Sequence, residues 1–298
     1  MEPVNDEISH GTPLTQQDVS SYTIAPMLVF QIDKWRRAHG GGGRSLRVLD
    51  YGCGRGRTLF RLRELGYEAY GVDVDPSPIE NGRVLARMLG LDAQRVLTPL
   101  DANGRTAYED DFFDLTSSFQ VFEHVQDIDA AARELARITR PGGAGIHVFP
   151  PRWYPIEGHL AMPFVHWLPK NRSRYALIRA WVALGVEAKL RAYEGLDAKQ
   201  RAEKFHRFLN EETAYRSCGD VVRAFRAAGL RVRVVSIESP NVVRRLGRVL
   251  DVPGVRTALN WLLSRCASIH LLYEKPSAVA RIGRAEDDDC LVAEARPL

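Results

Sequence analysis

Short apolar runs alternate with amphipathic stretches between residues 46 and 149. Five runs have the length and composition of buried strands: 46–51, 68–73, 95–98, 114–119 and 144–149. The stretches between them repeat apolar residues at helical spacing, and a glycine ends two of them, at Gly66 and Gly90. Strands that alternate with helices predict an α/β fold with a doubly wound, Rossmann-like, mostly parallel sheet and right-handed crossovers.

The alternation stops after Pro150, where the chain becomes rich in aromatic, histidine and proline residues. Residues 151–210 thus form an insertion after the fifth strand, with a long helix expected over 174–193. The sheet is then completed by a helix over 210–228, a strand over 231–236, a helical stretch over 242–266 that breaks at Pro253-Gly254, and a last strand over 268–274. The expected sheet therefore has seven strands.

These patterns divide the chain into five parts. Residues 1–43 begin with a polar segment up to Ser21 that we expect to be loose, followed by a helix over 24–37 and a flexible Gly40–Gly43 joint. We expect that helix to pack on the sheet. Residues 44–150 form the α/β core, 151–210 the insertion, and 211–275 the completion of the sheet. The acidic tail 276–298 is expected to be disordered.

The stretch from Leu46 to Gly56 indicates a strand that runs into a glycine-rich turn, with a helix beginning behind it. Glycine lets the backbone turn sharply and approach a ligand, and a helix N-terminus adds unsatisfied N–H groups. Asp50 stands directly before the turn, and Asp73 ends the next strand, 21 residues after Gly52. This is close to the spacing of about 20 at which an acidic residue reaches a ribose hydroxyl. A pocket that is acidic on two sides favours a nucleoside with a positive charge over a diphosphate.

Composition and charge exclude several other classes. The 298 residues are 45% apolar, enough for a buried core, and 41 basic against 37 acidic residues give a charge of +4. This mild excess does not indicate a nucleic-acid surface. The four cysteines have no paired spacing, so we expect neither zinc nor disulfides, and a cytoplasmic location. We expect no secretion signal and no spanning helix, because no apolar run approaches about 20 residues.

The turn Asp50-Tyr51-Gly52-Cys53-Gly54-Arg55-Gly56 resembles the first motif of class I S-adenosylmethionine-dependent methyltransferases with a type 11-like core. The resemblance covers about residues 46–150 and continues in the same order and spacing through four further segments: Gly71–Asp73, Leu100–Ala102, Phe113–Leu115 with Gln120–Val125, and Arg140–Gly143. It implies S-adenosyl-L-methionine as cofactor and a last strand that runs antiparallel between strands five and six. It also implies that the insertion over residues 151–210 is a helical substrate cap, and that the helix over 24–37 covers the cofactor, which is compatible with packing on the sheet.

The resemblance also implies a set of cofactor-binding residues: Asp50, Gly52, Cys53, Gly54, Asp73, Val74, Asp101, Ala102 and Gln120. Asp50 and Gln120 would lie near the methionine end, Asp73 would accept from the ribose hydroxyls, and Asp101 would accept from the adenine amino group. Cys53 is interpreted as a small residue that fits the turn, not as a nucleophile. For Asp101, a plain turn role stays open.

The candidate catalytic residues are His124, His159 and His166. An oxygen or carbon acceptor must lose a proton, and an imidazole titrates near neutrality. Glu123-His124 also resembles a frequent structural feature of the subgroup, so a structural role for His124 stays open. His159 and His166 are expected to face the acceptor or each other. Their spacing with Glu157 is compatible with a metal, but no second ligand pair has a recognised spacing, and we expect no metal.

Residues 255–266 predict an amphipathic helix with several arginines nearby. Such a helix packs on the sheet or on a second subunit, or lies on an anionic membrane. Packing is favoured, and we expect no stable membrane insertion. Peripheral membrane contact through Val255–Cys266 and oligomerisation are left open.

The sequence thus predicts a methyltransferase that acts on a small-molecule acceptor, with O-methylation favoured and no nucleic-acid substrate. One alternative is a nicotinamide-dependent oxidoreductase, which Asp50 disfavours, as does Arg57 at the place of a third glycine. Another is a methyltransferase-like protein that binds the cofactor without catalysis. The segment after strand four lacks the Asn/Asp-Pro-Pro-aromatic tetrad of many enzymes that methylate DNA amino groups. The acceptor and the methylated atom are not fixed by the sequence.

Overall fold

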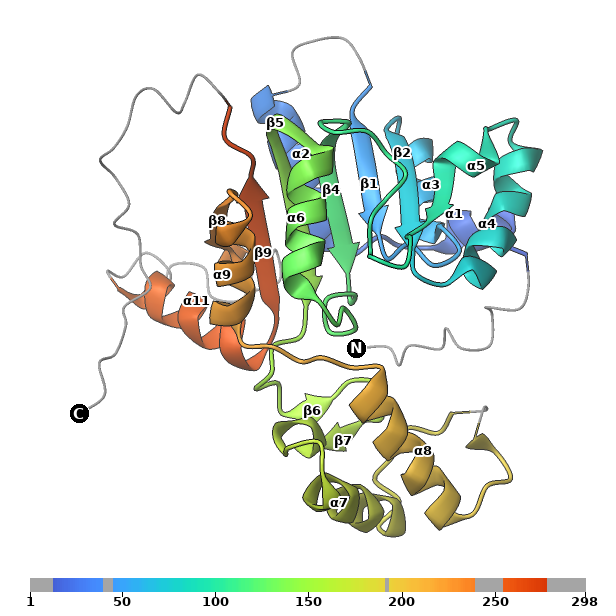
Figure 1. The fold of residues 1–298 in the computed structure, drawn as a ribbon, viewed down its shortest axis with the longest axis vertical. Helices are drawn as coiled ribbons and strands as arrows, with labels where there is room; N and C mark the ends of the chain where they lie inside the picture. The colour runs from blue at the N-terminus through green and yellow to red at the C-terminus, as the bar shows by residue number, and fades with distance from the viewer. Residues whose placement is uncertain (1–12, 40–44, 191–192, 239–253, 278–298) are drawn as a thin grey trace.

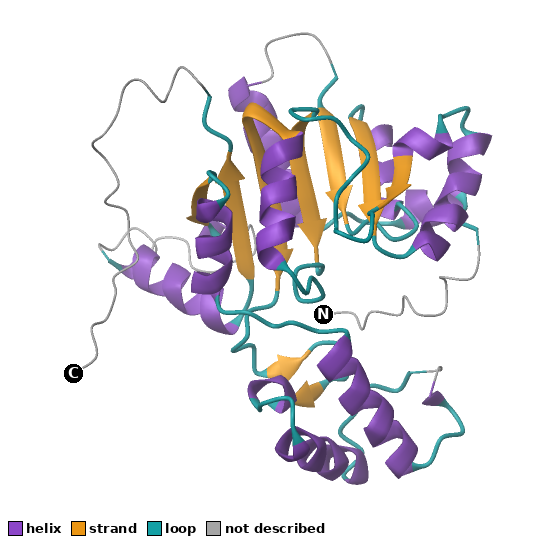
Figure 2. Ribbon diagram, viewed as in Figure 1, coloured by secondary structure: helices purple, strands orange, loops and turns teal. Residues whose placement is uncertain are grey.

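The structure, a computed structural model, describes residues 13–39, 45–190, 193–238 and 254–277. A seven-stranded sheet forms its centre, and helices cover both faces of the sheet (Figures 1 and 2). The strands are β1 (Arg47–Tyr51), β2 (Glu68–Asp73), β3 (Leu97–Pro99), β4 (Phe113–Phe119), β5 (Thr139–Phe149), β8 (Arg231–Val234) and β9 (Ile269–Glu274).

The strand order in the sheet is β3-β2-β1-β4-β5-β9-β8. Strands β1 to β5 pair in parallel, whereas β9 runs antiparallel to both β5 and β8. This confirms the doubly wound, mostly parallel sheet and the antiparallel last strand between strands five and six. The order reverses between β1 and β4, so chain connections diverge there to the two halves of the sheet.

The two faces of the sheet are covered by separate helix layers, because side chains alternate along each strand. Val48 faces one hydrophobic cluster and Leu49 faces the other. The first layer holds α2 (Pro26–His39), α3 (Arg57–Glu64) and α4 (Pro76–Met88), and the second holds α6 (Ile128–Ile138) and α9 (Cys218–Ala227). Two short helices, α1 (Gln16–Ser21) and α5 (Ala93–Val96), lie beside α3 and α4. Met27, Leu28 and Ile32 of α2 are buried, so this helix packs on the sheet.

The middle of the sheet contains buried polar groups that are paired across strands. The Tyr273 hydroxyl lies 2.6 Å from Thr116 Oγ1 and 2.8 Å from Thr139 Oγ1. His147 lies 2.8 Å from the Ser118 hydroxyl. Gly145 makes room for the tyrosine, because a Cβ at this position would stand 2.2 Å from a carbon of the Tyr273 ring.

The smaller unit lies beyond the end of β5 and next to the loop after β4 (Figure 1). It comprises β6 (Ile156–Glu157), β7 (Met162–Pro163), the 3-10 turn η2 (Val165–Trp167), α7 (Arg172–Ala183) and α8 (Ala198–Glu211). It has its own hydrophobic cluster, in which Met162, Ile178 and Phe205 are fully buried. We call residues 151–211 the cap.

The cap helices differ from the expected single helix over 174–193, which is wrong. Gly185, with a φ of 69°, follows α7 in a left-handed conformation that ends a helix. The next helix begins only at Ala198, where Asp197 and Gln200 form a capping box. Asn210 therefore lies inside α8, and α9 begins at Cys218 behind the N-cap Ser217.

Two other expectations near the core are also corrected. Residues 16–21 form α1, because Thr15 and Asp18 make a capping box, although the segment looked loose. Strand β5 begins at Thr139, before the Pro141-Gly142-Gly143 segment expected to separate helix from strand. The pairing with β4 shifts register there, from Phe113–Thr139 to Leu115–Ala144, so these residues form an irregularity inside the strand. The expected Gly40–Gly43 joint, the helix over 242–253 and nearly all of the tail lie outside the described residues.

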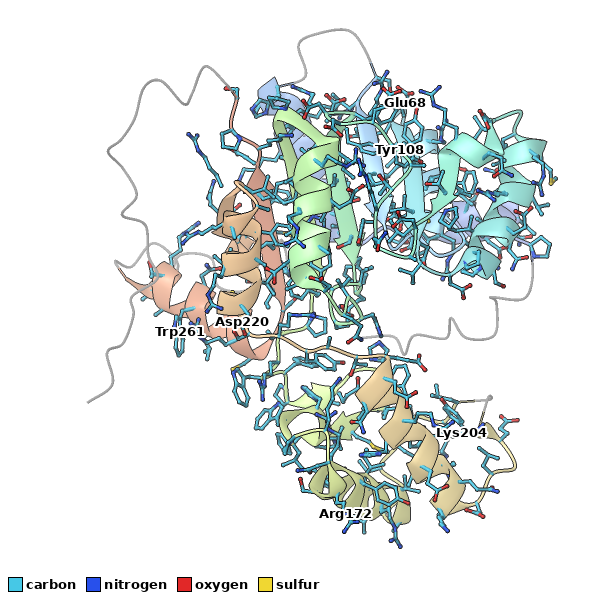
Figure 3. The ribbon with its side chains drawn as sticks, viewed as in Figure 1. Glu68, Tyr108, Arg172, Lys204, Asp220 and Trp261 are labelled. Atoms are coloured by element: carbon cyan, nitrogen blue, oxygen red, sulfur yellow. The ribbon has the colours of Figure 1, made fainter. Side chains whose placement is uncertain are left out.

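Helix α11 (Val255–Cys266) rests against β9 and the 3-10 turn η4 (Ser236–Glu238). Asn260 of this helix donates a hydrogen bond of 2.7 Å to the carbonyl of Val234. Trp261 and Leu262 are about half exposed, and Trp261 lies on the outer side of the helix (Figure 3). Across the described ranges, no helix combines the length and apolar character needed to cross a membrane.

We expect Gly145→Ala to lower the free energy of unfolding by about 1–3 kcal/mol, because the new methyl group would overlap the Tyr273 ring and the Thr116 hydroxyl. Urea denaturation followed by circular dichroism measures the change. Gly158→Ala is the matched control, since a Cβ there has no atom within 4 Å. Equal effects at both positions would contradict the packing described for Gly145.

Candidate functional site

Four loops meet at the carboxyl edge of the parallel strands. They follow β1, β2, β3 and β4, which are neighbours in the sheet. The loops after β1 and β4 lie on the two sides of the point where the strand order reverses, which is where ligands bind in open α/β sheets. Nearly all of the residues that the sequence suggested for the cofactor stand in these loops or at the strand ends before them.

The turn after β1 depends on glycine at two positions. Gly52 has a φ of +79°, and a Cβ there would stand 2.4 Å from a methyl carbon of Val121 in the loop after β4. Gly54 has a φ of +52° and open space beside it. The Gly54 N–H donates a hydrogen bond of 2.8 Å to Asp73 Oδ2, which joins the turn to the end of β2. Both glycines are partly exposed, and the space that a side chain would need is filled by Val121 at Gly52 and is open at Gly54.

Asp50 is buried at the end of β1, with 5% of its surface exposed. Burial, together with the charge of Asp73, raises the pKa of Asp50 to about 7, although a hydrogen bond with Thr58 opposes the shift. The ionised form is unfavourable because the carboxylate is shielded from water and is repelled by the charge of Asp73. A cation placed between the two acids would remove this penalty.

Asp73 is held in one orientation by backbone N–H groups. Its Oδ2 accepts from Gly54 and its Oδ1 accepts a hydrogen bond of 3.1 Å from the N–H of Asp75. Each carboxylate oxygen has a second lone pair that remains for a ligand hydroxyl. Val74 follows directly and is 74% exposed, which places an apolar surface beside the carboxylate.

Cys53 and Asp101 have clear structural roles. The Cys53 side chain is buried against Gly71, where a Cβ would stand 2.7 Å from the sulfur, and burial raises the pKa of its thiol. Its small size therefore suits the turn, and the thiol stays protonated. Asp101 Oδ1 accepts hydrogen bonds of 2.8 Å from the N–H groups of Asn103 and Arg105, which form a turn. Ala102 is exposed within the same turn.

Gln120 follows β4 in a left-handed backbone conformation, with a φ of 57°. Residues other than glycine rarely adopt it, and such strained positions gather at functional sites. The Gln120 N–H donates a hydrogen bond of 2.8 Å to the Val148 carbonyl on β5, so the loop leaves the sheet at a fixed angle.

His124, in the loop after β4, meets His159 of the cap. Their Nε2 atoms lie 3.1 Å apart. The Nδ1 atom of His124 lies 2.8 Å from the Glu212 carbonyl, and the Nδ1 atom of His159 lies 2.8 Å from Glu157 Oε1. Burial, followed by the charge of His159, lowers the pKa of His124. The structure thus joins two of the three candidate catalytic histidines.

Glu157, on β6, is fully buried behind His159. Burial alone would raise its pKa, but hydrogen bonds from His159, Tyr215 and the Leu160 N–H outweigh burial and lower the pKa. The Tyr215 hydroxyl donates a hydrogen bond of 2.6 Å to Glu157 Oε1. Glu157 is therefore an ionised carboxylate that orients His159.

Glu123 stands beside this pair in the loop after β4 and is 1% exposed. Neither of its carboxylate oxygens has a hydrogen-bond partner among the residues that the structure describes. Burial raises the pKa of Glu123 to about 7. One oxygen of Glu123 and one nitrogen each of His124 and His159 lie within 4.8 Å of one another. We call Glu123, His124 and His159 the histidine–glutamate cluster.

His166 is separated from the histidine–glutamate cluster. Its ring packs on that of Tyr215, with 4.5 Å between the ring centroids, and burial lowers its pKa to about 4. It remains neutral near pH 7 and supports Tyr215 rather than facing His159. The sequence did not indicate Tyr215 or the carbonyl of Glu212, because both follow the cap helices and no motif marks them.

The comparisons with known proteins find methyltransferases. Residues 49–146 match a family model described as a methyltransferase domain. An uncharacterized methyltransferase of Mycobacterium avium is 32% identical over 148 residues, which cover 48% of this chain and 55% of that protein. A ubiquinone biosynthesis O-methyltransferase of Brucella anthropi is 29% identical over 133 residues, covering 44% and 52%.

The names of other similar proteins indicate N-methylation. Norajmaline N-methyltransferase of Rauvolfia serpentina is 31% identical over 96 residues, covering 32% of each chain. The chain spans about half the length of the first curated relatives that it matches. Among solved structures, a phosphoethanolamine N-methyltransferase 2 of Haemonchus contortus aligns with a TM-score of 0.47 and 13% identity, over 88% of this chain and 56% of that one. This alignment is too loose to support a conclusion about function.

We expect Asp50→Asn to change how stability depends on pH. The pKa of Asp50 is about 7 in the folded protein against 3.8 for the free side chain, so the folded state keeps a proton that the unfolded state has released. The free energy of unfolding of the wild type therefore falls as pH rises from about 4 to 7. The variant lacks this loss and should gain on the order of 2–4 kcal/mol relative to the wild type between pH 4 and 8.

Urea denaturation at pH 4, 5, 6, 7 and 8 measures this effect. The raised pKa of Glu123 also makes the free energy of unfolding fall as pH rises. The slope of this free energy against pH should therefore be smaller in Asp50→Asn than in the wild type, but not zero. Asp129→Asn, an exposed acid on α6, is the control and should leave the slope unchanged. Parallel pH profiles for the wild type and Asp50→Asn would show that Asp50 is not buried as described.

Proposed function

We propose that this chain, whose residues 49–146 match a methyltransferase domain, is a class I S-adenosylmethionine-dependent methyltransferase that transfers a methyl group from that cofactor to a small molecule. The observation that carries the proposal is the buried Asp50 near the end of β1, whose pKa is raised by burial and by the charge of Asp73 at the end of β2. S-adenosylmethionine brings a sulfonium and an ammonium group, which are the positive charges that two close acids need.

The cofactor residues have distinct parts in this proposal. Asp50 attracts the methionine end, and the open backbone at Gly54 lets the cofactor approach the turn. Asp73 accepts from the ribose hydroxyls through its remaining lone pairs, and the exposed Val74 contacts the adenine. Gln120 lies near the methionine portion. For Asp101, the turn contacts of Oδ1 leave Oδ2 for the adenine amino group.

The acceptor is proposed to bind between the carboxyl edge of the sheet and the cap, with the His124–His159 pair at its polar end. Because a hydroxyl acceptor holds its proton at neutral pH, this pair would favour O-methylation. The acceptor oxygen forms a bond to the methyl carbon as the carbon–sulfur bond breaks. The sulfonium would become a neutral thioether, and the acceptor proton would pass to an Nε2 atom of the His124–His159 pair. The O-methyltransferase among the relatives supports this choice, although an N-methyltransferase is also among them.

Titration calorimetry with S-adenosylmethionine tests the proposal, and we expect binding in the micromolar range. Asp73→Ala should weaken it by about 10- to 100-fold, because hydrogen bonds to a charged group contribute about 1.5–3 kcal/mol. Asp129→Asn should bind as the wild type does. NADH serves as the competing ligand, and its binding in place of S-adenosylmethionine would favour an oxidoreductase. Cofactor binding without turnover of any acceptor would favour a non-catalytic role.

Cofactor affinity should rise with pH between 6 and 8. Only ionised Asp50 attracts the cationic cofactor, and its pKa of about 7 in the free protein means that this form increases over that range. The dissociation constant should fall by up to about tenfold, with a proton released on binding below pH 7. Calorimetry in two buffers of different ionisation enthalpy measures the proton. Asp50→Asn should bind more weakly and without this pH dependence, and an unchanged dependence would exclude Asp50 as its origin.

A further inference from the structure

The histidine–glutamate cluster combines residues from two parts of the chain. Glu123 and His124 belong to the loop after β4, and His159 belongs to the turn of the cap hairpin. Their ligand-type atoms all lie within 4.8 Å of one another. Two imidazole nitrogens and one carboxylate are a ligand set of catalytic zinc sites, in which a fourth position stays open.

The hydrogen bonds of the two histidines fix where their lone pairs point. Nδ1 of His124 faces a carbonyl oxygen, and Nδ1 of His159 faces the carboxylate of Glu157, so each Nδ1 must carry the hydrogen. In the neutral rings, each Nε2 then has a lone pair and no hydrogen. These two lone pairs face each other at 3.1 Å, which is unfavourable unless a cation or a proton stands between them.

The surroundings of Glu123 favour a cation over a proton between the two histidines. A proton shared by the histidines would satisfy both nitrogens but would leave the two oxygens of Glu123 without a hydrogen bond, in a position that is 1% exposed. A buried carboxylate without a partner is costly. A metal ion bound by all three groups satisfies the carboxylate and both lone pairs at once.

We propose that Glu123, His124 and His159 bind one divalent transition-metal ion, with zinc as the expected ion. Zinc binds histidine nitrogens at about 2.0–2.1 Å, so two nitrogens 3.1 Å apart can share it at an angle between the octahedral and tetrahedral values. Magnesium is not expected, because it prefers oxygen ligands.

The surroundings of the two histidines match those of metal ligands in general. A histidine that binds a metal nearly always donates its other N–H to a carboxylate or a backbone carbonyl, which orients the ring. Glu157 has this position behind His159, and the Glu212 carbonyl has it behind His124. Tyr215 in turn donates to Glu157. Glu157 is therefore a positioning residue for the metal site.

The chemical consequence rests on the proposed function, whereas the metal site itself does not. A metal at this point would bind an acceptor oxygen in its open position and favour the anion, because a metal lowers the pKa of a bound hydroxyl. The acceptors would then be molecules that offer an ionisable hydroxyl, such as a phenol, with or without a second oxygen beside it. Loss of zinc binding and loss of cofactor binding are measured separately.

The test is zinc binding by the full chain, without cofactor or acceptor. The protein is treated with a chelator, desalted, titrated with Zn²⁺ by calorimetry and analysed for bound metal by mass spectrometry. We expect one zinc per chain, and at least tenfold weaker binding by Glu123→Gln and by His159→Gln. Glu157→Gln should weaken binding by about 10- to 100-fold. His206→Gln is the control, since His206 lies on α8 and contacts the Asn171 carbonyl.

Thermal unfolding with and without zinc tests binding even where a substitution lowers the stability of the protein. Zinc should raise the melting temperature of the wild type and of His206→Gln more than that of Glu123→Gln, whatever the starting value of each protein. Co²⁺ should give the visible absorption bands of a tetrahedral site in the wild type but not in Glu123→Gln. Equal zinc uptake by the wild type and the Glu123→Gln/His159→Gln double variant would overturn the proposal, as would binding of Mg²⁺ in preference to Zn²⁺.

Discussion

The contact between Gly52 and Val121 holds together the two loops on which the site depends. The methyl groups of Val121 occupy the space that a side chain at position 52 would need. The turn after β1 and the loop after β4 are thereby in van der Waals contact. That second loop also carries Glu123, whose carbonyl accepts a hydrogen bond of 2.6 Å from the N–H of Ala214 in the segment returning from the cap. The turn after β1, the loop after β4 and the segment returning from the cap are thus linked by these two contacts.

The sequence was most informative where local spacing is tied to backbone geometry. The strand, the glycine turn and Asp73 follow one another within 30 residues, and each needs its residue type for a local physical reason. The pair His124–His159 could not be predicted in the same way, because the cap brings the two residues together across 35 positions. The cap helices were also misjudged, since the apolar pattern runs past Gly185 and only the left-handed glycine ends the helix.

Two buried carboxylates give the site its electrostatic character. Asp50 stands near the end of β1 and Glu123 in the loop after β4, and each is almost completely shielded from water. Sequences that only had to fold would place neutral residues at such positions, because burial of an acid reduces stability. Both acids are explained if the site is completed by positively charged groups from outside the chain.

The two ends of the cap lie next to each other. The N–H of Arg152, where the chain leaves the core, donates a hydrogen bond of 3.0 Å to the carbonyl of Arg216, where the chain returns. The chain thus leaves and re-enters the core at one paired stem, and the insertion between has its own hydrophobic cluster. A different insertion on the same stem would leave the strand pairing of the sheet unchanged, whereas the loop after β4 would lose its contacts with His159 and Ala214. Replacement of the segment between residues 152 and 216 would therefore alter that loop and nothing in the sheet.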